Sequence, residues 1–252
     1  MTFAPPEARL DPVLPEPDTD TDAGGRLEPL HFDEGTLELW KAFSPLAMER
    51  RRWALTRGQV EPWRAGQALQ LGGEVAVVVT GAFAVHVGLS GLAADILGPG
   101  DVLCTGAHRA ISGEWISDGR LYRTTPGDWT ETAAMEGMSH LLDGVDRRRE
   151  SLELGLACAA RHLATERVAD LLTAVQAATG LAAARLSQDR LGQMLGLRRT
   201  TVNASCRALQ KAGVIRTVRG QIRIHRLDGL KAAACGCRRM AAAPATTGPL
   251  AS

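Results

Sequence analysis

The segment from Met194 to His225 has the composition that most clearly indicates a functional site, because it is rich in arginine and contains no Asp or Glu. Around it, residues 185–231 hold eleven Arg and Lys against two acids, a net charge of +9. The whole chain of 252 residues has a net charge of only +1. A segregation of this size indicates a polyanionic partner. The alternative is an ordinary solvated basic surface. The arrangement of the basic residues in the predicted structure distinguishes the two interpretations.

Two short helices joined by a tight turn are predicted over residues 187–213. Ser187 is a good N-cap for the first helix, and Gly196 can end it in a left-handed backbone conformation. The second helix is expected from Arg199 to about Lys211, with apolar residues on one face and polar residues on another. This is the pattern of a helix-turn-helix, whose second helix enters the major groove of DNA and reads base edges from its N-terminal residues.

The polar side chains of the second helix are of the types that read bases. Arginine bonds guanine through two hydrogen bonds, asparagine does so with adenine, and threonine packs its methyl group on thymine. Residues 214–225 alternate around a glycine turn and predict a β hairpin, a wing whose arginines would follow the phosphate backbone while Val218 and the other apolar residues face the core. The expected DNA-binding residues are Ser187, Gln188, Arg198, Arg199, Thr200, Thr201, Asn203, Arg207, Arg216 and Arg219.

A long dimerisation helix is expected before the helix-turn-helix, over residues 129–163. Its apolar residues alternate at spacings of three and four, which is the pattern of a coiled-coil seam. A helix that packs on its own domain is the alternative, but a small β roll could cover only part of it. We therefore expect a homodimer. The predicted dimerisation residues are Met138, Leu142, Val145, Leu152, Leu156 and Ala159.

The first half of the chain predicts a β-rich domain behind an acidic arm. Residues 1–34 are rich in Pro and Asp, carry a net charge of −7, and are expected to be disordered. Short strands separated by glycine turns over residues 35–128 predict a small antiparallel β roll. Short helices at its start are expected to cover a sheet. Their apolar residues are Leu37, Trp40, Phe43 and Leu46.

The predicted fold class is therefore α+β. The β roll is followed by the long helix and then by a winged helix-turn-helix over residues 164–237. Residues 238–252 are expected to form a flexible tail.

The five cysteines are odd in number and scattered, which is typical of reduced thiols rather than of a disulfide framework. Cys158 and Cys206 lie among apolar residues at helical spacing and are expected to be small core side chains. Cys235 and Cys237 are close enough to suggest metal chemistry. However, one such pair without further ligands falls short of a four-ligand site, so we expect no metal.

Other function classes leave little trace in the sequence. No run of about 18 apolar residues is present and the N-terminus lacks the signal-peptide pattern, so a cytoplasmic protein without membrane contact is expected. Residues 35–128 contain no P-loop, GxSxG, HExxH or paired-carboxylate motif, so we do not expect an enzyme. An enzyme or metabolite-binding domain fused to a DNA-binding domain is the alternative. A dimer that binds DNA without sensing a ligand is another.

Residues 185–237, RLSQDRLGQMLGLRRTTVNASCRALQKAGVIRTVRGQIRIHRLDGLKAAACGC, resemble the C-terminal winged helix of the Crp/Fnr regulators, relatives of the cyclic-AMP receptor protein. The stretches GAFAVHVG and LGPGDVL are similar to parts of the family's effector domain, a cyclic-nucleotide-binding-like jelly roll. The resemblance implies a homodimeric, sequence-specific transcription regulator that binds a palindromic DNA site and contacts RNA polymerase.

The recognition helix matches the family pattern in part. Arg199, Thr201 and Val202 agree with it, whereas Thr200 and Ala204 stand where the cyclic-AMP receptor pattern has a glutamate and an arginine. The resemblance therefore implies a target sequence that differs from that of the cyclic-AMP receptor.

The effector domain departs further from the pattern. Cyclic-nucleotide binders of the family cradle the phosphate with a Gly-Glu pair and an Arg followed by Ser or Thr, and GDVLCTGAHRAIS has no clear match to either. Leu152 and Glu153 stand where relatives place hydroxyl groups. We therefore expect no cyclic nucleotide and identify no cofactor, although another small-molecule effector stays open.

The metal-containing branches of the family are not favoured either. The N-terminus lacks the cysteine cluster of the iron–sulfur branch. Cys104, His86 and His108 are the candidate haem ligands, and we expect all three to be structural.

Overall fold

The computed structural model describes residues 34–44, 46, 48–88, 90–105, 110–131, 134–218 and 220–242. These residues belong to one compact unit. The predicted acidic arm lies outside the described residues except for Glu34, as do residues 243–252 of the predicted tail and Arg219 of the predicted wing.

Two four-stranded antiparallel sheets form the predicted β roll. One sheet has the strand order β1-β8-β3-β6 and the other β2-β7-β4-β5. Leu71, Phe83 and Trp115 belong to a cluster with side chains from both sheets and are at most 2% exposed. The strands are β1 (Gln59–Trp63), β2 (Ala68–Gly72), β3 (Val75–Thr80), β4 (Phe83–His86), β5 (Ala93–Leu97), β6 (Val102–Cys104), β7 (Ala110–Trp115) and β8 (Gly119–Thr124).

Strand β3 is buried on both faces, which explains its unbroken apolar sequence. Ala76 and Val78 contribute to the cluster between the sheets. Val75, Val77 and Val79 belong to a second cluster with residues of the N-terminal helices. The roll therefore has one core inside it and another on its outer face.

Helices α1 (Glu34–Ala42) and α2 (Met48–Arg57) come before the roll, as expected. Phe43 and Leu46 are buried in the second cluster as predicted, whereas Leu37 is 40% exposed. Leu39 takes its place at 6% exposed. The prediction was wrong for Leu37 because a spacing of three residues throughout drifts off a helical face that has 3.6 residues per turn.

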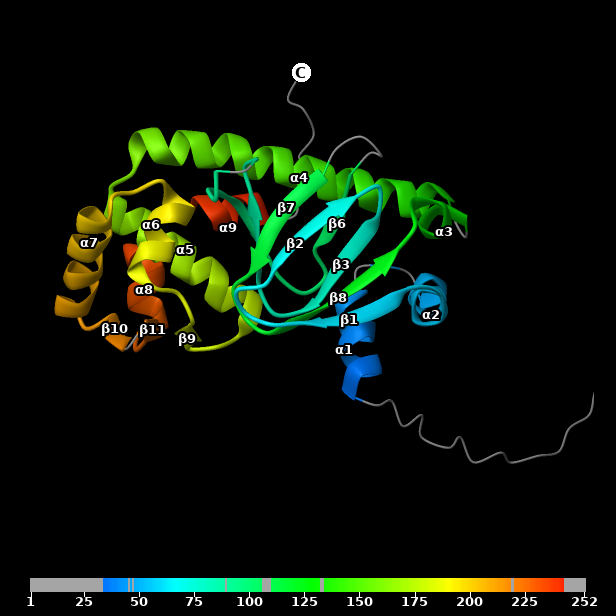
Figure 1. Cartoon of the computed structure of the whole chain (residues 1–252), viewed down its shortest axis with the longest axis horizontal. Coiled ribbons are helices and arrows are strands. Elements are labelled where there is room, and N and C mark those ends of the chain that lie inside the picture. The colour runs from blue at the N-terminus through cyan, green and yellow to red at the C-terminus, as the bar shows by residue number, and fades with distance from the viewer. Residues whose placement is uncertain are drawn as a thin grey trace, which may run out of the picture. The chain divides into compact units, whose positions relative to one another are not determined.

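A short helix, α3 (Pro126–Glu131), precedes the long helix α4 (Ala134–Arg161). Helix α4 runs along the β strands and continues past them to the C-terminal helices (Figure 1). One face of α4 packs on its own chain. There Gly144 lies so close to Val102 that an added Cβ would be 3.4 Å from it, and Ser151 donates to the carbonyl of Ala94 over 3.3 Å.

The C-terminal part is a winged helix-turn-helix, and its buried cluster continues into the roll through Ala82, Ala84 and Ile116. Val168, Leu172, Leu191, Val202 and Ile222 are all 0% exposed in one cluster. Together with the β roll and the long helix, this confirms the predicted α+β architecture. The elements are α5 (Ala164–Thr179), β9 (Ala183–Ala184), α6 (Gln188–Leu195), α7 (Arg199–Lys211), β10 (Ile215–Val218), β11 (Gln221–Ile224), α8 (Leu227–Ala233) and α9 (Cys237–Ala242).

Residues 238–242, which were expected in a flexible tail, form most of helix α9 instead. This helix packs against α4 and α5. The composition of this stretch gives no sign of it, because the contacts that hold the helix come from distant parts of the chain.

Candidate nucleic-acid interface

The turn between α6 and α7 is set by local backbone chemistry. Ser187 caps α6 by accepting a hydrogen bond from the backbone N–H of Arg190 over 3.1 Å. Gly196 ends the helix with a φ of +63°, a conformation that glycine adopts without strain. A Cβ on Gly192 would lie 2.8 Å from the carbonyl oxygen of Leu197, so the chain can turn this closely only over glycine. These residues fix the direction in which α7 leaves the turn.

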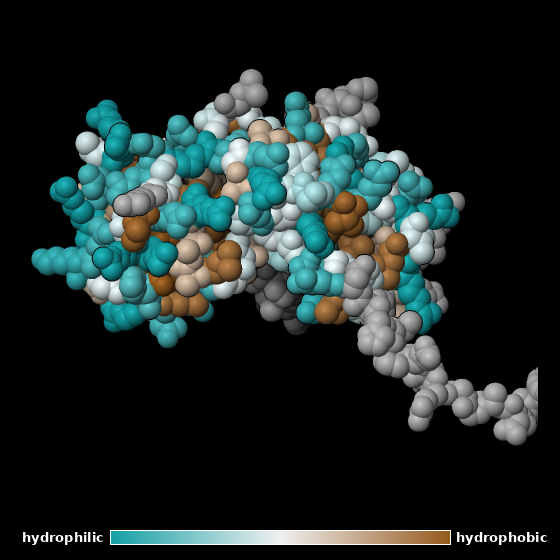
Figure 2. Space-filling view, turned by 60° about the horizontal axis from the view of Figure 1, so that its bottom comes forward, coloured by the Kyte–Doolittle hydropathy of each residue, from teal (hydrophilic) through white to brown (hydrophobic). Residues whose placement is uncertain are grey.

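Helix α7 divides into a buried face and an exposed face. Val202 and Cys206 are 0% exposed and Leu209 is 3% exposed, so the apolar face is locked in the core. The exposed side chains gather at the opposite face, and Figure 2 shows hydrophilic side chains projecting at the end of the molecule where α7 lies. Of the predicted DNA-binding residues in and before α7, Arg198, Arg199, Thr200 and Arg207 are exposed, and Thr201 and Asn203 are half-buried.

The N-terminus of α7 is open to an anion. Arg198 occupies the N-cap position in extended conformation, and its side chain makes no capping hydrogen bond. The first backbone N–H groups of a helix have no partner within the helix, and together with the helix dipole they favour a phosphate. Ser187 is exposed and Gln188 half-buried at the start of α6, where the same reasoning places a phosphate contact.

Arg199 is paired in the free protein, although the segment from Met194 to His225 contains no acid. Its Nε lies 3.2 Å from Oδ1 of Asp189 in α6, with the two side chains 77% and 57% exposed. An exposed ion pair of this kind contributes only about 0–1 kcal/mol, so a phosphate or a guanine can compete for the arginine. Asp189 is one of the two acids within residues 185–231, but a net charge does not show which base an acid pairs with.

The wing is an antiparallel pair of strands, β10 and β11. Arg216 and Arg223 are directly opposite each other in its register, and both are exposed. Ile215 and Ile222 face the core at 3% and 0% exposed. Val218 is 36% exposed, so its predicted place in the core was wrong. It lies three residues after Ile215, and side chains an odd number of positions apart point to opposite faces of a strand.

Two other bases of the segment stabilise the fold. Arg190 bonds Glu114 of β7 and also approaches Nε2 of His86 in β4 at 3.2 Å, which joins α6 to the roll. Arg226 donates to the backbone carbonyl of Ala212 over 2.5 Å and so satisfies the end of α7. The ion pair with Glu114 compensates the charge of Arg190, so less positive charge is available to a partner. The contacts of Arg190 with His86 and of Arg226 with Ala212 cross 104 and 14 residues of sequence and have no local signature.

A cavity of about 490 Å³ lies where β5, α4 and α5 meet, and the charged residues Asp95, Arg147 and Lys231 are among its lining residues. Burial raises the pKa of the Asp95 carboxyl, and the nearby Arg238 opposes that rise. Burial also raises the pKa of Asp101, which pairs with Arg147 over 3.0 Å. The cavity combines a mainly apolar lining with several charged side chains, which is the composition of small-molecule sites in general.

Two of the three candidate haem ligands belong to the described residues, and they lie in different sheets. Cys104 is in β6 and His86 in β4. His108 lies outside the described residues. A cluster of three cysteines was not predicted from the sequence. Cys158 lies beside Cys235 and Cys237, although the three are separated by up to 79 positions in the chain.

Comparisons with known proteins agree with the architecture. Residues 166–233 match the family of the Crp-like helix-turn-helix domain. No curated protein matches the chain. In the parts of the chain that the structure describes, each helix is too short or too polar to span a bilayer.

Several solved structures share the fold. FixK2 from Bradyrhizobium japonicum is 22% identical, with 71% of this chain and 98% of that chain covered and a TM-score of 0.57. A transcriptional regulator of the Crp/Fnr family from Eubacterium rectale is 14% identical, with 82% and 100% covered and a TM-score of 0.56. The c-di-GMP-responsive global regulator CLP from Xanthomonas campestris is 12% identical, with 71% and 100% covered and a TM-score of 0.55.

The matched domain carries the site described above, since it includes α6, α7 and the wing. The solved structures extend the likeness in fold to the roll and the long helix. Residues 166–233 are therefore similar to the Crp-like helix-turn-helix domain, and the chain shares the fold of these solved structures.

Proposed function

We propose that the protein is a homodimeric, sequence-specific transcription regulator that reads a palindromic DNA site with α7. The observation that carries the proposal is the division of α7 into two faces. Arg199, Asn203 and Arg207 share one face, because they follow one another at spacings of four residues. The opposite face is fixed in the core by Val202 and Cys206. The reading face therefore has a fixed orientation relative to the domain.

The exposed face of α4 supports the homodimer. Large apolar side chains are open to solvent there, with Leu156 78% exposed and Leu142 56% exposed. The other face of the helix already packs on the roll through Leu141, Gly144 and Ser151. A long apolar stripe on a soluble protein marks an interaction surface, and its heptad spacing suits the same stripe of a second copy. The exposed members are Met138, Leu142, Val145, Leu152, Leu156 and Ala159.

The packing of the roll supports an effector other than a cyclic nucleotide, if the protein has one. Phe83, Trp115 and Leu121 are 0% exposed and occupy the region between the two sheets. Trp63 stacks on Trp115 with ring centroids 6.4 Å apart. A close-packed apolar interior suits a structural domain better than a pocket for a charged nucleotide.

The test is selection of bound fragments from genomic DNA with the full-length protein, followed by binding measurements on the selected site. We expect an inverted repeat whose half-sites are about one helical turn apart, bound by two chains. Arg199→Ala should lose about 1–3 kcal/mol of discrimination between this site and one with a changed half-site base. Lys211→Ala is the matched control, because Lys211 is an exposed base at the far end of the same helix.

Two results would overturn the proposal. One is recovery of fragments without a shared sequence, which would reduce the protein to a non-specific DNA binder. The other is binding by a single chain to a site without symmetry, which would remove the dimer.

A further inference from the structure

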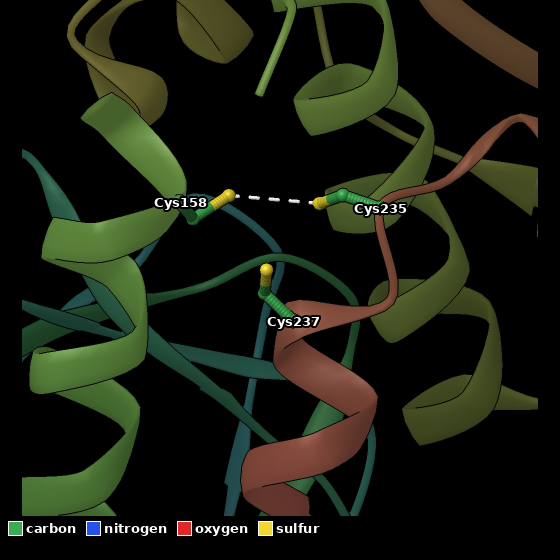
Figure 3. Close-up of side chains that lie close together, drawn as sticks. All are labelled: Cys158, Cys235 and Cys237. Atoms are coloured by element: carbon green, nitrogen blue, oxygen red, sulfur yellow. Dashed lines mark hydrogen bonds between the residues drawn. The ribbon is translucent and has the colours of Figure 1, made fainter. Parts of the chain in front are cut away.

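Three thiols converge where the end of α4 meets the start of α9. The Sγ atoms of Cys158, Cys235 and Cys237 all lie within 4.8 Å of one another, and those of Cys158 and Cys235 are 3.5 Å apart. Figure 3 shows the side chains pointing into one space from α4 on one side and from the loop and first turn of α9 on the other. Cys158 is buried and the other two are half-buried.

The loop that carries two of these thiols is held rigidly. The carboxylate of Asp170, which is 3% exposed, accepts hydrogen bonds from the backbone N–H groups of Gly236 over 3.0 Å and Arg238 over 3.1 Å. Gly236 has a φ of +78°, which a side chain would strain. The hydrogen bonds from the backbone occupy the carboxylate of Asp170. They also hold the backbone around Cys235 and Cys237 in place without a ligand.

The spacing of the sulfurs suits a single metal ion. Zinc binds thiolate sulfur at about 2.3 Å, so tetrahedral sulfur ligands lie about 3.8 Å apart. The three sulfurs need only small side-chain rotations to reach that spacing. A disulfide between Cys158 and Cys235 would account for two of the thiols, but it would give no reason for the third to point at them.

We propose that Cys158, Cys235 and Cys237 form a binding site for one soft, thiophilic metal ion of the Zn²⁺ or Cu⁺ class. Thiolates select such ions over hard cations. Binding replaces the thiol protons, which pass to solvent, and it requires no oxidation. A cavity of about 750 Å³ borders Cys158 and Cys237, so an ion can enter and a fourth coordination position can be filled from solvent.

The site would join parts of the chain that are distant in sequence. Cys158 belongs to the long helix, whereas Cys235 and Cys237 follow the wing and α8. Arg167 of α5, which also borders the cavity, donates to the carbonyl of Leu195 at the end of α6 over 2.7 Å. A bound ion would therefore fasten the end of the DNA-binding domain to the helix that carries the apolar stripe.

The test uses the full-length, reduced protein under nitrogen, titrated with Zn²⁺ and, separately, with Cu⁺ against a chromophoric chelator. We expect one ion per chain, with three sulfur ligands at about 2.3 Å in X-ray absorption. Cys158→Ser, Cys235→Ser and Cys237→Ser should each weaken binding by at least about 100-fold. Cys104→Ser is the matched control and should bind as the wild type does, since Cys104 lies in β6 away from the group.

A second measurement guards against variants that fail to fold. In the wild-type protein, the metal should protect the three thiols from alkylation and leave the reactivity of Cys104 unchanged. Binding of less than half an ion per chain, or equal loss in Cys104→Ser, would overturn the proposal. So would a reduced protein that takes no metal and readily forms a Cys158–Cys235 disulfide, because the pair would then be a redox pair.

Discussion

Arg216 and Arg223 lie directly opposite each other across the wing hairpin, with both guanidinium groups exposed. Like charges at paired positions of a hairpin destabilise it by about 0.2–1 kcal/mol relative to neutral pairs. The pair therefore costs the free protein a little stability, and a row of phosphates would remove that cost. The paired positions of the two arginines therefore favour binding of a polyanion to the wing.

Replacing one of the two arginines should move stability and binding in opposite directions. Arg223→Gln should raise the free energy of unfolding by about 0.2–1 kcal/mol, because the repulsion is removed. It should weaken DNA binding to all sequences and reduce the slope of log affinity against log salt by about 1, as expected for one lost phosphate contact. Urea unfolding and a salt series of binding curves measure the two effects. Lys231→Gln, an exposed base on α8, should change neither.

The Asp189–Arg199 ion pair predicts that Asp189 competes with DNA for the side chain of Arg199. Asp189→Asn should tighten DNA binding by about 1.5- to 5-fold, because Arg199 is released and a negative charge near the phosphates is lost. Equilibrium binding to the selected site at several salt concentrations checks this, and the gain should shrink as salt screens the pair. Weaker binding by Asp189→Asn would show instead that the carboxylate orients Arg199 for its base.

The residues that sequence predicts well are those whose signals are local. Ser187 and Gly196 mark the ends of α6 by capping chemistry, and the spacing of Val202, Cys206 and Leu209 marks the buried face of α7. These signals depend only on neighbours along the chain, so the helix-turn-helix and its family can be recognised without coordinates.

Other features depend on contacts between distant segments and could not be predicted. Glu114 bonds Arg190 across 76 positions, and Cys158 meets Cys235 across 77. Helix α9 forms where the composition suggested a tail, because α4 and α5 provide a surface for it. No periodicity in the sequence encodes such pairings, since each partner looks ordinary in its own surroundings.

A single charge on the exposed stripe of α4 should separate the proposed dimer without unfolding the protomer. Leu156→Glu places a carboxylate on a side chain that is 78% exposed in the protomer, so folding should be unchanged while a second copy is repelled. Sedimentation should show a shift from two chains to one. Ala157→Glu adds the same charge one residue further, at an exposed position off the heptad seam, and should remain a dimer. Dimerisation by both variants would locate the interface elsewhere.

His86 predicts a dependence of stability on pH. Burial lowers its pKa below the usual 6.5, the neighbouring Arg190 lowers it further, and Glu114 opposes them. Because its pKa is lower in the folded protein, His86 takes up a proton more readily in the unfolded chain than in the folded one. The contribution of neutral His86 to the free energy of unfolding is therefore present in full above about pH 6.5 and is lost as the pH falls. His86→Gln should therefore flatten the fall in stability between about pH 7 and pH 5. Urea unfolding across this range is the measurement, and His225→Gln, an exposed histidine, is the control.

Metal occupancy of the three-cysteine site should be linked to DNA binding. An ion that fastens α9 to α4 restricts the position of each reading helix relative to the dimer seam, so less freedom is lost when DNA binds. We expect Zn²⁺ to tighten binding to the selected site by about 5-fold or more, and DNA to tighten Zn²⁺ binding by the same factor, because linkage is reciprocal. Cys237→Ser should lose both effects and Cys104→Ser should keep them. If Zn²⁺ binds with three sulfur ligands but leaves DNA affinity unchanged, the site is structural and the two functions are independent.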